Sequence, residues 1–191
     1  MYHEPSIPIF ILTFSAGVVL TLVTFSVPFI KPFYFLHSSV AGGITYGIWG
    51  WCLDVNGSCS PKQFGYREDP EIVPILLKLH VLFPIAAGLA LLSSVTLIPV
   101  MCSSARGLYP FPLFVILSTL ACISSLTGFA ICIATWLIAL HRFHADGFEA
   151  SLGPLVWMAL AGTALLLFVA LNAGCSMMWK RGHRRSFIYT Y

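Results

Sequence analysis

Charged residues are scarce in this sequence. Asp, Glu, Lys and Arg make up 9% of the 191 residues, whereas soluble globular proteins carry about 25%. So few charges cannot cover a water-facing surface, and hydrophobic residues make up 58%. The composition therefore excludes an ordinary soluble domain and predicts a surface that mostly faces lipid. The net charge of +3 is also too small and too dispersed to indicate nucleic acid as a partner.

The patterns of common enzyme active sites are also missing. The sequence has no Gly-rich phosphate loop, no Ser-His-Asp arrangement and no His/Cys spacing typical of a metal site. His141 and His144 are three residues apart, but no third ligand accompanies them. Glu68, Asp69 and Glu71 lie in a polar stretch that is better explained as a solvated loop. We therefore predict a protein that is not an enzyme, with no cofactor, no metal and no small-molecule substrate.

Four long apolar runs organise the chain. They cover about residues 8–30, 75–101, 111–140 and 154–179. Each reaches the roughly 20 residues that a helix needs to cross a hydrocarbon core of about 30 Å. The first run is longer than the core of a cleaved signal peptide and has no Lys or Arg before it, which favours a retained helix. The fold class predicted is an all-α membrane protein, a four-helix transmembrane bundle that forms one domain over residues 1–191.

Prolines and glycines punctuate these runs. Pro28 predicts an early end or a kink in the first helix. Pro84 and Gly88 predict a kink in the second helix, the one feature that hints at the broken helices of a channel or transporter. The third run is long enough to tilt or to project beyond the membrane. Gly128 and Gly162 lie among small residues of the third and fourth runs and are candidate contacts for a partner.

The distribution of basic residues predicts the orientation. Four of them cluster near the carboxyl end without an acidic neighbour: Lys180, Arg181, Arg184 and Arg185. Because Lys and Arg are retained on the cytoplasmic side, residues 180–191 are predicted to be a cytoplasmic tail. Four crossings then place the amino end inside as well. Residues 31–74 and 141–152 become the two outer loops.

Two cysteines lie close together in the first outer loop. Cys52 and Cys59 are the only cysteines in a segment predicted to be outside, where disulfides persist, so we expect them to pair. Asn56-Gly57, between them, is a strong turn signal. Asn56-Gly57-Ser58 is also a glycosylation sequon, which makes Asn56 a candidate for modification on this side of the membrane.

The residues before the cysteines are aromatic, β-branched and rich in glycine. The stretch from Phe33 to Trp51 predicts short strands joined by tight turns, and hence a small extracellular antiparallel β-sheet on the helix ends. A sheet of this size needs the helices and the disulfide for stability. Alternation along a strand would send Trp49 and Trp51 to opposite faces. We expect Trp49 to be structural and Trp51 to contact a partner.

Four histidines fall on the predicted outer side. They are His37, His80, His141 and His144. Histidine titrates near neutral pH, so protonation of these side chains is a candidate means of changing the packing between the outer loops. Ordinary interfacial histidines are the simpler explanation of the same pattern.

The arrangement resembles the claudin-like superfamily, which has four spans, a long first outer loop and a short second one. The residues that match are Gly47, Ile48, Trp49, Gly50, Cys52, Cys59, Gly65 and Tyr66. Their form is more similar to the fungal branch of that superfamily, the Sur/PalI family. The resemblance implies a claudin-like fold and a multi-pass protein of the plasma membrane that is not an enzyme.

The resemblance also implies a role in assisting other membrane proteins. PalI-type proteins help a larger membrane sensor reach or stay in the plasma membrane during the ambient-pH response, and Sur-type relatives organise domains of the cell cortex. The implied partners are membrane lipids, other multi-span membrane proteins or a second copy of the chain. The alternatives are a claudin-like cell-contact protein and a subunit of a channel or transporter.

Overall fold

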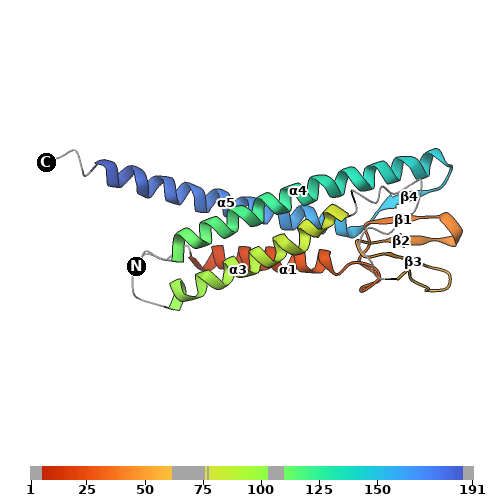
Figure 1. The fold of residues 1–191 in the computed structure, drawn as a ribbon, viewed down its shortest axis with the longest axis horizontal. Coiled ribbons are helices and arrows are strands. Elements are labelled where there is room, and N and C mark those ends of the chain that lie inside the picture. Colours follow the sequence, from red (N-terminus) through yellow and green to blue (C-terminus); the bar gives the residue numbers. More distant parts are fainter. Residues whose placement is uncertain (1–5, 62–75, 77, 103–109, 187–191) are drawn as a thin grey trace.

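The computed structural model describes residues 6–61, 76, 78–102 and 110–186. Within these ranges, four long helices form a bundle and a small sheet covers one end of it (Figure 1). The helices are α1 (Ser6–Thr24), α3 (Leu82–Cys102), α4 (Pro110–Ala145) and α5 (Pro154–Ser186). Each is long and apolar enough to cross a membrane, as a multi-pass membrane protein requires.

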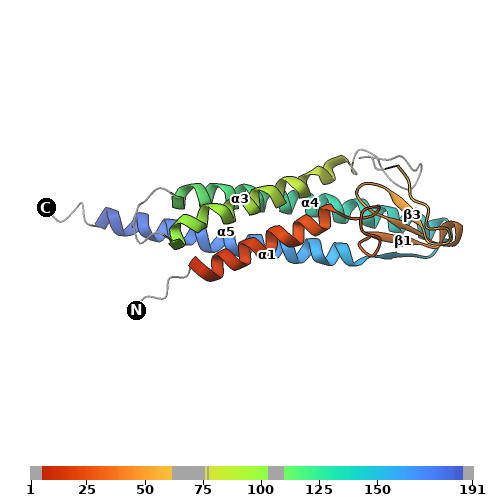
Figure 2. The ribbon, with the colours of Figure 1, turned by 90° about the horizontal axis from the view of Figure 1, so that it is seen from below.

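The bundle closes because each helix packs against two neighbours. α1 and α4 both contact α3 and α5 (Figure 2). Small residues permit the close approach, since Gly128 of α4 lies against Leu82 of α3 and Gly162 of α5 lies against Leu20 of α1. We predicted these two glycines as contacts for a partner. Both are buried, and the structure uses them for packing within the chain instead.

The first helix ends earlier than its apolar run. We predicted a span to residue 30 with an early end or a kink at Pro28, and α1 ends at Thr24. The reason is local, because Pro28 has no N–H to donate to the carbonyl of Thr24, four residues before it. The chain then leaves the helix axis, and Ser26 and Val27 are buried at the end of the bundle.

The kink predicted in the second apolar run does not form. A 3₁₀ turn, η2 (Leu79–Val81), comes first, and α3 begins at Leu82, so Pro84 falls in its first turn. Backbone N–H groups at this position have no partner within the helix, so a proline costs little there. Gly88 has open space around it, and α3 continues past it to Cys102.

α4 extends past the membrane-crossing length and supports the sheet. Its 36 residues span about 54 Å at 1.5 Å per residue. The last turns lie beside the sheet (Figure 1). Phe143 in this part is buried, and its ring centre lies 5.8 Å from that of Tyr46 in the sheet. The long third helix therefore extends beyond the other helices at the sheet end of the bundle and packs against the outer loops.

The sheet confirms the prediction of a small antiparallel structure in the first outer loop. Its strand order is β3-β2-β1-β4. The first three strands are β1 (Leu36–Ser38), β2 (Ile44–Tyr46) and β3 (Trp51–Leu53), and a 3₁₀ turn, η1 (Val40–Gly42), lies between β1 and β2. Neighbouring strands pair antiparallel. Leu36, Ile44 and Tyr46 are buried and join the core of the bundle.

The fourth strand comes from the second outer loop, where we predicted no strand. β4 (Ala150–Leu152) pairs antiparallel with β1. Ser39 and Glu149 extend this pairing, because the Ser39 N–H donates to Glu149 O at 2.8 Å and the Glu149 N–H donates to Ser39 Oγ at 3.0 Å. Three residues are too few for an alternating pattern to indicate a strand. The two loops thus form one structural unit.

Candidate functional site

The Gly-Ile-Trp-Gly segment connects β2 to β3 and lies against the end of α1. Ile48 is fully buried, and its N–H donates to Ser26 Oγ at 2.9 Å. The indole Nε1–H of Trp49 donates to Thr24 O at 2.7 Å. This is the carbonyl for which Pro28 supplies no helical donor, so Trp49 caps the last turn of α1. The segment therefore fastens the sheet to the first helix.

The two glycines of this segment permit close approaches. A Cβ on Gly47 would lie 2.3 Å from Val27 O, which belongs to the backbone. A Cβ on Gly50 would lie 2.3 Å from Ser60 Oγ, and this hydroxyl accepts a hydrogen bond from the Trp51 N–H at 3.0 Å. Both distances are far shorter than a van der Waals contact. The motif thus needs glycine at position 47, where the close atom is backbone, whereas a Cβ at position 50 would displace the Ser60 hydroxyl from the Trp51 N–H.

Trp49 has the structural role that we predicted, but its position differs. We expected Trp49 and Trp51 to alternate along one strand, whereas Trp49 lies in the connection before β3 begins. The ring of Trp49 meets Phe29 edge-on at 5.7 Å, and Phe29 meets Phe25 in the same way at 5.9 Å. Phe25 and Phe29 are exposed. Trp49 therefore packs within an aromatic group that continues beyond the end of α1.

Trp49→Phe is expected to lower the stability of the protein by about 1 kcal/mol. Phenylalanine keeps the aromatic contact with Phe29, but it removes the donor to Thr24 O. The measurement is the thermal unfolding midpoint of the full chain in mild detergent. Trp51→Phe is the control, because it leaves the bond at Thr24 in place. Equal shifts for the two variants would argue against the capping role of Trp49.

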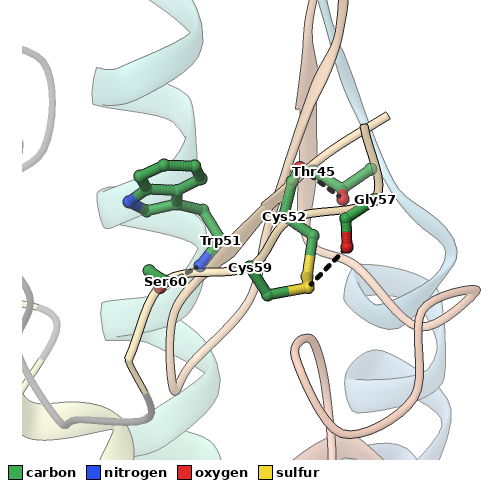
Figure 3. Close-up of a disulfide and its surroundings, with 6 residues drawn as sticks. All are labelled: Thr45, Trp51, Cys52, Gly57, Cys59 and Ser60. Atoms are coloured by element: carbon green, nitrogen blue, oxygen red, sulfur yellow. Dashed lines mark hydrogen bonds between the residues drawn. A yellow bond between two sulfur atoms is a disulfide. The ribbon is translucent and has the colours of Figure 1, made fainter. Parts of the chain in front are cut away.

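The predicted disulfide is present and closes a hairpin. Cys52 and Cys59 are bonded (Figure 3). Inside their loop the Leu53 N–H donates to Ser58 O at 2.8 Å. Thr45 Oγ1 of β2 donates to Cys52 O at 3.2 Å, which ties the hairpin to the sheet. The hairpin is therefore held by the covalent bond and by hydrogen bonds both within it and to β2.

Trp51 is placed where it can meet a partner. It is half-buried, and part of its side chain packs against the core of the bundle. Figure 3 shows its indole on the side of the strand opposite to the disulfide. The Ser60 N–H donates to Trp51 O at 2.9 Å. Trp51 thus carries a partly exposed indole, and hydrogen bonds with Ser60 hold its backbone in place on β3.

The turn of the hairpin displays the glycosylation sequon. Asp54, Val55 and Asn56 form the turn and are exposed, with 65% of Val55 accessible. Gly57 has a φ of 62°, in the left-handed region that favours glycine. Lys31 Nζ reaches this turn, 3.4 Å from the position of a Cβ on Gly57. The geometry leaves Asn56 accessible for modification.

The histidines that we grouped as candidate pH sensors have different partners in the structure. His37 Nε2 lies 2.9 Å from Asp54 Oδ2, which joins β1 to the hairpin on an exposed surface. His144 Nε2 lies 3.2 Å from Ala150 O, and His141 is exposed on α4. No group of three potential metal ligands occurs among the residues that the structure describes.

His80 is a core residue and not an interfacial one. It is fully buried in η2, and its Nδ1 lies 3.1 Å from Leu76 O. Its ring centre lies 6.1 Å from Phe35, 6.2 Å from Trp136 and 6.1 Å from Phe83. We placed it near the membrane surface because it lies near the start of the second apolar run, but in η2 its side chain is buried among the core residues. This burial removes His80 from the exposed candidates for pH sensing.

The sequence matches no protein-family model and no characterised protein. The functional argument therefore depends on the geometry at the end of the bundle that the sheet covers. Of the motif residues, Gly65 and Tyr66 lie outside the described residues, as does most of the polar part of the first outer loop.

Sequence reasoning missed the acceptors on which the motif docks. Ser26 and Thr24 bind the motif through an ordinary hydroxyl and a backbone carbonyl. Neither group has a signature in the sequence. The position of Pro28, four residues after Thr24, was the available signal for an unpaired carbonyl.

Proposed function

We propose that the chain is a scaffold or accessory protein of the plasma membrane, of the fungal Sur/PalI type, without enzymatic activity. The observation that carries this proposal is the docking of the Gly-Ile-Trp-Gly segment on α1. Together with the Cys52–Cys59 bond, it holds a rigid sheet on one end of a four-helix bundle. Such a claudin-like assembly offers a partner the partly exposed Trp51 of the sheet.

The proposal places both termini in the cytoplasm and the sheet outside the cell. α1 begins and α5 ends at the end of the bundle opposite the sheet (Figure 1). The basic cluster of the sequence falls at that end of α5, where the positive-inside rule puts Lys and Arg. The disulfide and the sequon fall at the other end, where an oxidising environment keeps cysteines paired. Two independent chemical criteria thus support one orientation.

The role proposed is to assist a larger multi-span membrane protein. The sensor of an ambient-pH response and the components of a cortical membrane domain are the two kinds of partner that the resemblance implies. Installing a photo-reactive benzoylphenylalanine at position 51 in intact membranes tests this role. The same group at position 157, on α5, is the matched control, because Trp157 is an exposed tryptophan that lies on a helix and not in the sheet.

Capture of one multi-span membrane protein at position 51, but not at position 157, is the expected result. Capture of a sensor would assign the pH response, and capture of cortical proteins would assign domain organisation. Solute or ion flux through the purified chain in vesicles would instead indicate a channel or transporter. Capture only between adjoining cells would indicate a cell-contact protein.

The pH hypothesis has its own prediction. We expect a triple His37→Gln, His141→Gln and His144→Gln variant to keep the pH response of cells within about twofold, because an exposed pair such as His37–Asp54 contributes about 0.5 kcal/mol. His80 stays unchanged, since its substitution would damage the core. The measurement is a reporter of the alkaline response at matched surface levels. Loss of the response in the triple variant would show that these histidines themselves sense pH.

A further inference from the structure

A small apolar slot lies between α4 and α5, at the end of these helices next to β4. Its volume is about 140 Å³. Phe129 and Ile133 of α4 line one side, and Val156 and Leu160 of α5 line the other. Leu152 of β4 lines the end nearest the sheet. The lining is entirely apolar, so the slot offers no hydrogen-bond donor or acceptor to a ligand.

The slot has a buried floor and an exposed rim. Trp136 is fully buried, and its ring stacks on Phe35 of the outer segment with centres 5.5 Å apart. Trp157 and Leu137 lie at the rim and are 66% and 47% exposed. The slot is therefore continuous with the outward faces of α4 and α5. An occupant would touch Trp136, which in turn supports the segment leading into β1.

The surroundings of the slot determine what can fill it. The lining residues of both helices lie within the stretches long and apolar enough to cross a membrane, 112–145 and 154–173. Apolar cavities of about 150 Å³ stay dry and take up small apolar groups. An empty cavity also loses the dispersion contacts of its lining atoms. In the proposed orientation the slot lies where the bundle passes through the bilayer, so hydrocarbon is the solvent at the rim and can enter without desolvating any polar group.

We propose that the slot holds part of the acyl chain of one phospholipid, drawn from the leaflet on the sheet side of the bundle. This lipid is a resident ligand, distinct from the lipids that exchange over the outer faces of the helices. It goes beyond the proposed function, because it would hold for a scaffold, a channel subunit or a cell-contact protein alike. Because the lining exposes no polar atom in the slot and the indole Nε1 of Trp136 is itself buried, the slot selects the chain and not the headgroup.

Photo-crosslinking tests the proposal directly. The full chain is reconstituted in phosphatidylcholine nanodiscs that contain a tracer phospholipid with a diazirine on its acyl chain, and labelled residues are mapped by mass spectrometry. We expect Ile133 and Leu160 to be labelled about tenfold more than Ile85, which corresponds to roughly 1.4 kcal/mol of preference. Ile85 is the reference because it is 48% exposed in the first turns of α3, at the same end of the bundle.

Two matched substitutions make the test specific. Ile133→Phe puts a ring into the slot and is expected to reduce labelling of Leu160 about tenfold, whereas Ile85→Phe makes the same change on an open face and leaves it unaltered. Leu160→Trp, at the exposed rim, gives a second blocking variant if Ile133→Phe folds poorly. In the Leu160→Trp variant, we expect the labelling of Ile133 to fall.

Four results would overturn the proposal. Equal labelling of the slot and of Ile85 would mean that only bulk lipid is present. Unchanged labelling in both blocking variants would place the tracer outside the slot. A photo-reactive leucine at position 160 that captures a second polypeptide instead of lipid would assign the slot to a protein partner. Replacing the phosphatidylcholine tracer by a phosphatidylglycerol tracer should leave the pattern unchanged, and a pattern confined to one headgroup would contradict selection of the chain.

Discussion

Gly47→Ala is expected to release the sheet from the end of α1. The new methyl group would lie 2.3 Å from Val27 O, and neither backbone segment can give way without breaking the bond from the Ile48 N–H to Ser26 Oγ. Forcing an added carbon into a packed site costs about 3 kcal/mol when backbone must move. The measurement is the thermal midpoint in detergent, together with the rate at which an added protease cuts the outer segment in sealed membranes.

Gly88→Ala is the matched control for this prediction. Gly88 lies in α3 with no atom within 4 Å of the position of its Cβ, so alanine meets nothing there. Alanine is also the better helix former by about 0.5–1 kcal/mol. We therefore expect this variant to match or exceed the parent in stability. If Gly47→Ala were as stable as Gly88→Ala, the docking of the motif on α1 would not matter to the fold.

Removal of the disulfide has the second largest expected effect. A Cys52→Ser, Cys59→Ser double variant should lose about 2.5 kcal/mol, the chain-entropy value for a closed loop of about eight residues. The hairpin would then depend on its hydrogen bonds alone, while the pairing of β1 with β2 and β4 is left intact. The effect is measured as a lower thermal midpoint and as faster proteolysis within the hairpin.

A reductant provides the internal control for the disulfide. Treating the parent chain with the reductant should lower its thermal midpoint as much as the double substitution does. The midpoint of the double variant should not change on the same treatment. Cys122 and Cys132 are buried free thiols, so a reductant has no bond to break at either position. If the thermal midpoint of the parent chain did not change on full reduction, the Cys52–Cys59 disulfide would contribute nothing to stability.

The helices were predictable because one physical requirement dominates them. A helix in lipid must satisfy its own backbone and present apolar side chains over about 20 residues, so the four runs stand out in the sequence. Their ends were harder to predict, because local backbone chemistry decides them. Pro28 ends α1 at Thr24, whereas Pro84 is harmless because α3 begins only two residues before it. The same residue type thus has opposite effects in the two helices.

The disulfide hairpin was also predictable, because its signals lie within a few residues of one another. Two cysteines flank an Asn-Gly pair, and the structure places the left-handed Gly57 in that turn. The docking surface and β4 were not predictable, because they join segments distant in sequence. Ile48 binds Ser26, 22 residues away, and Glu149 binds Ser39, 110 residues away. Short strands and single hydroxyls carry no periodic pattern that indicates such pairings.

The burial of polar and small residues was predicted least well. His80, Gly128 and Gly162 look like surface or interface residues by type and position. In the structure, aromatic rings surround His80, and both glycines lie in helix contacts within the chain. Helix rotation decides which face of a span points inward. A chain that is apolar on all sides gives little indication of that rotation, because its lipid-facing and core-facing side chains are alike.

The central claim is that lipid surrounds a four-helix bundle that displays an oxidised Cys52–Cys59 hairpin outside the cell. Thiol accessibility in intact cells, probed with a membrane-impermeant maleimide before and after an impermeant reductant, tests it most directly. The account predicts that both cysteines are unlabelled before reduction and labelled after it while the cells stay closed. Labelling before reduction, or labelling only after the cells have been opened, would contradict it.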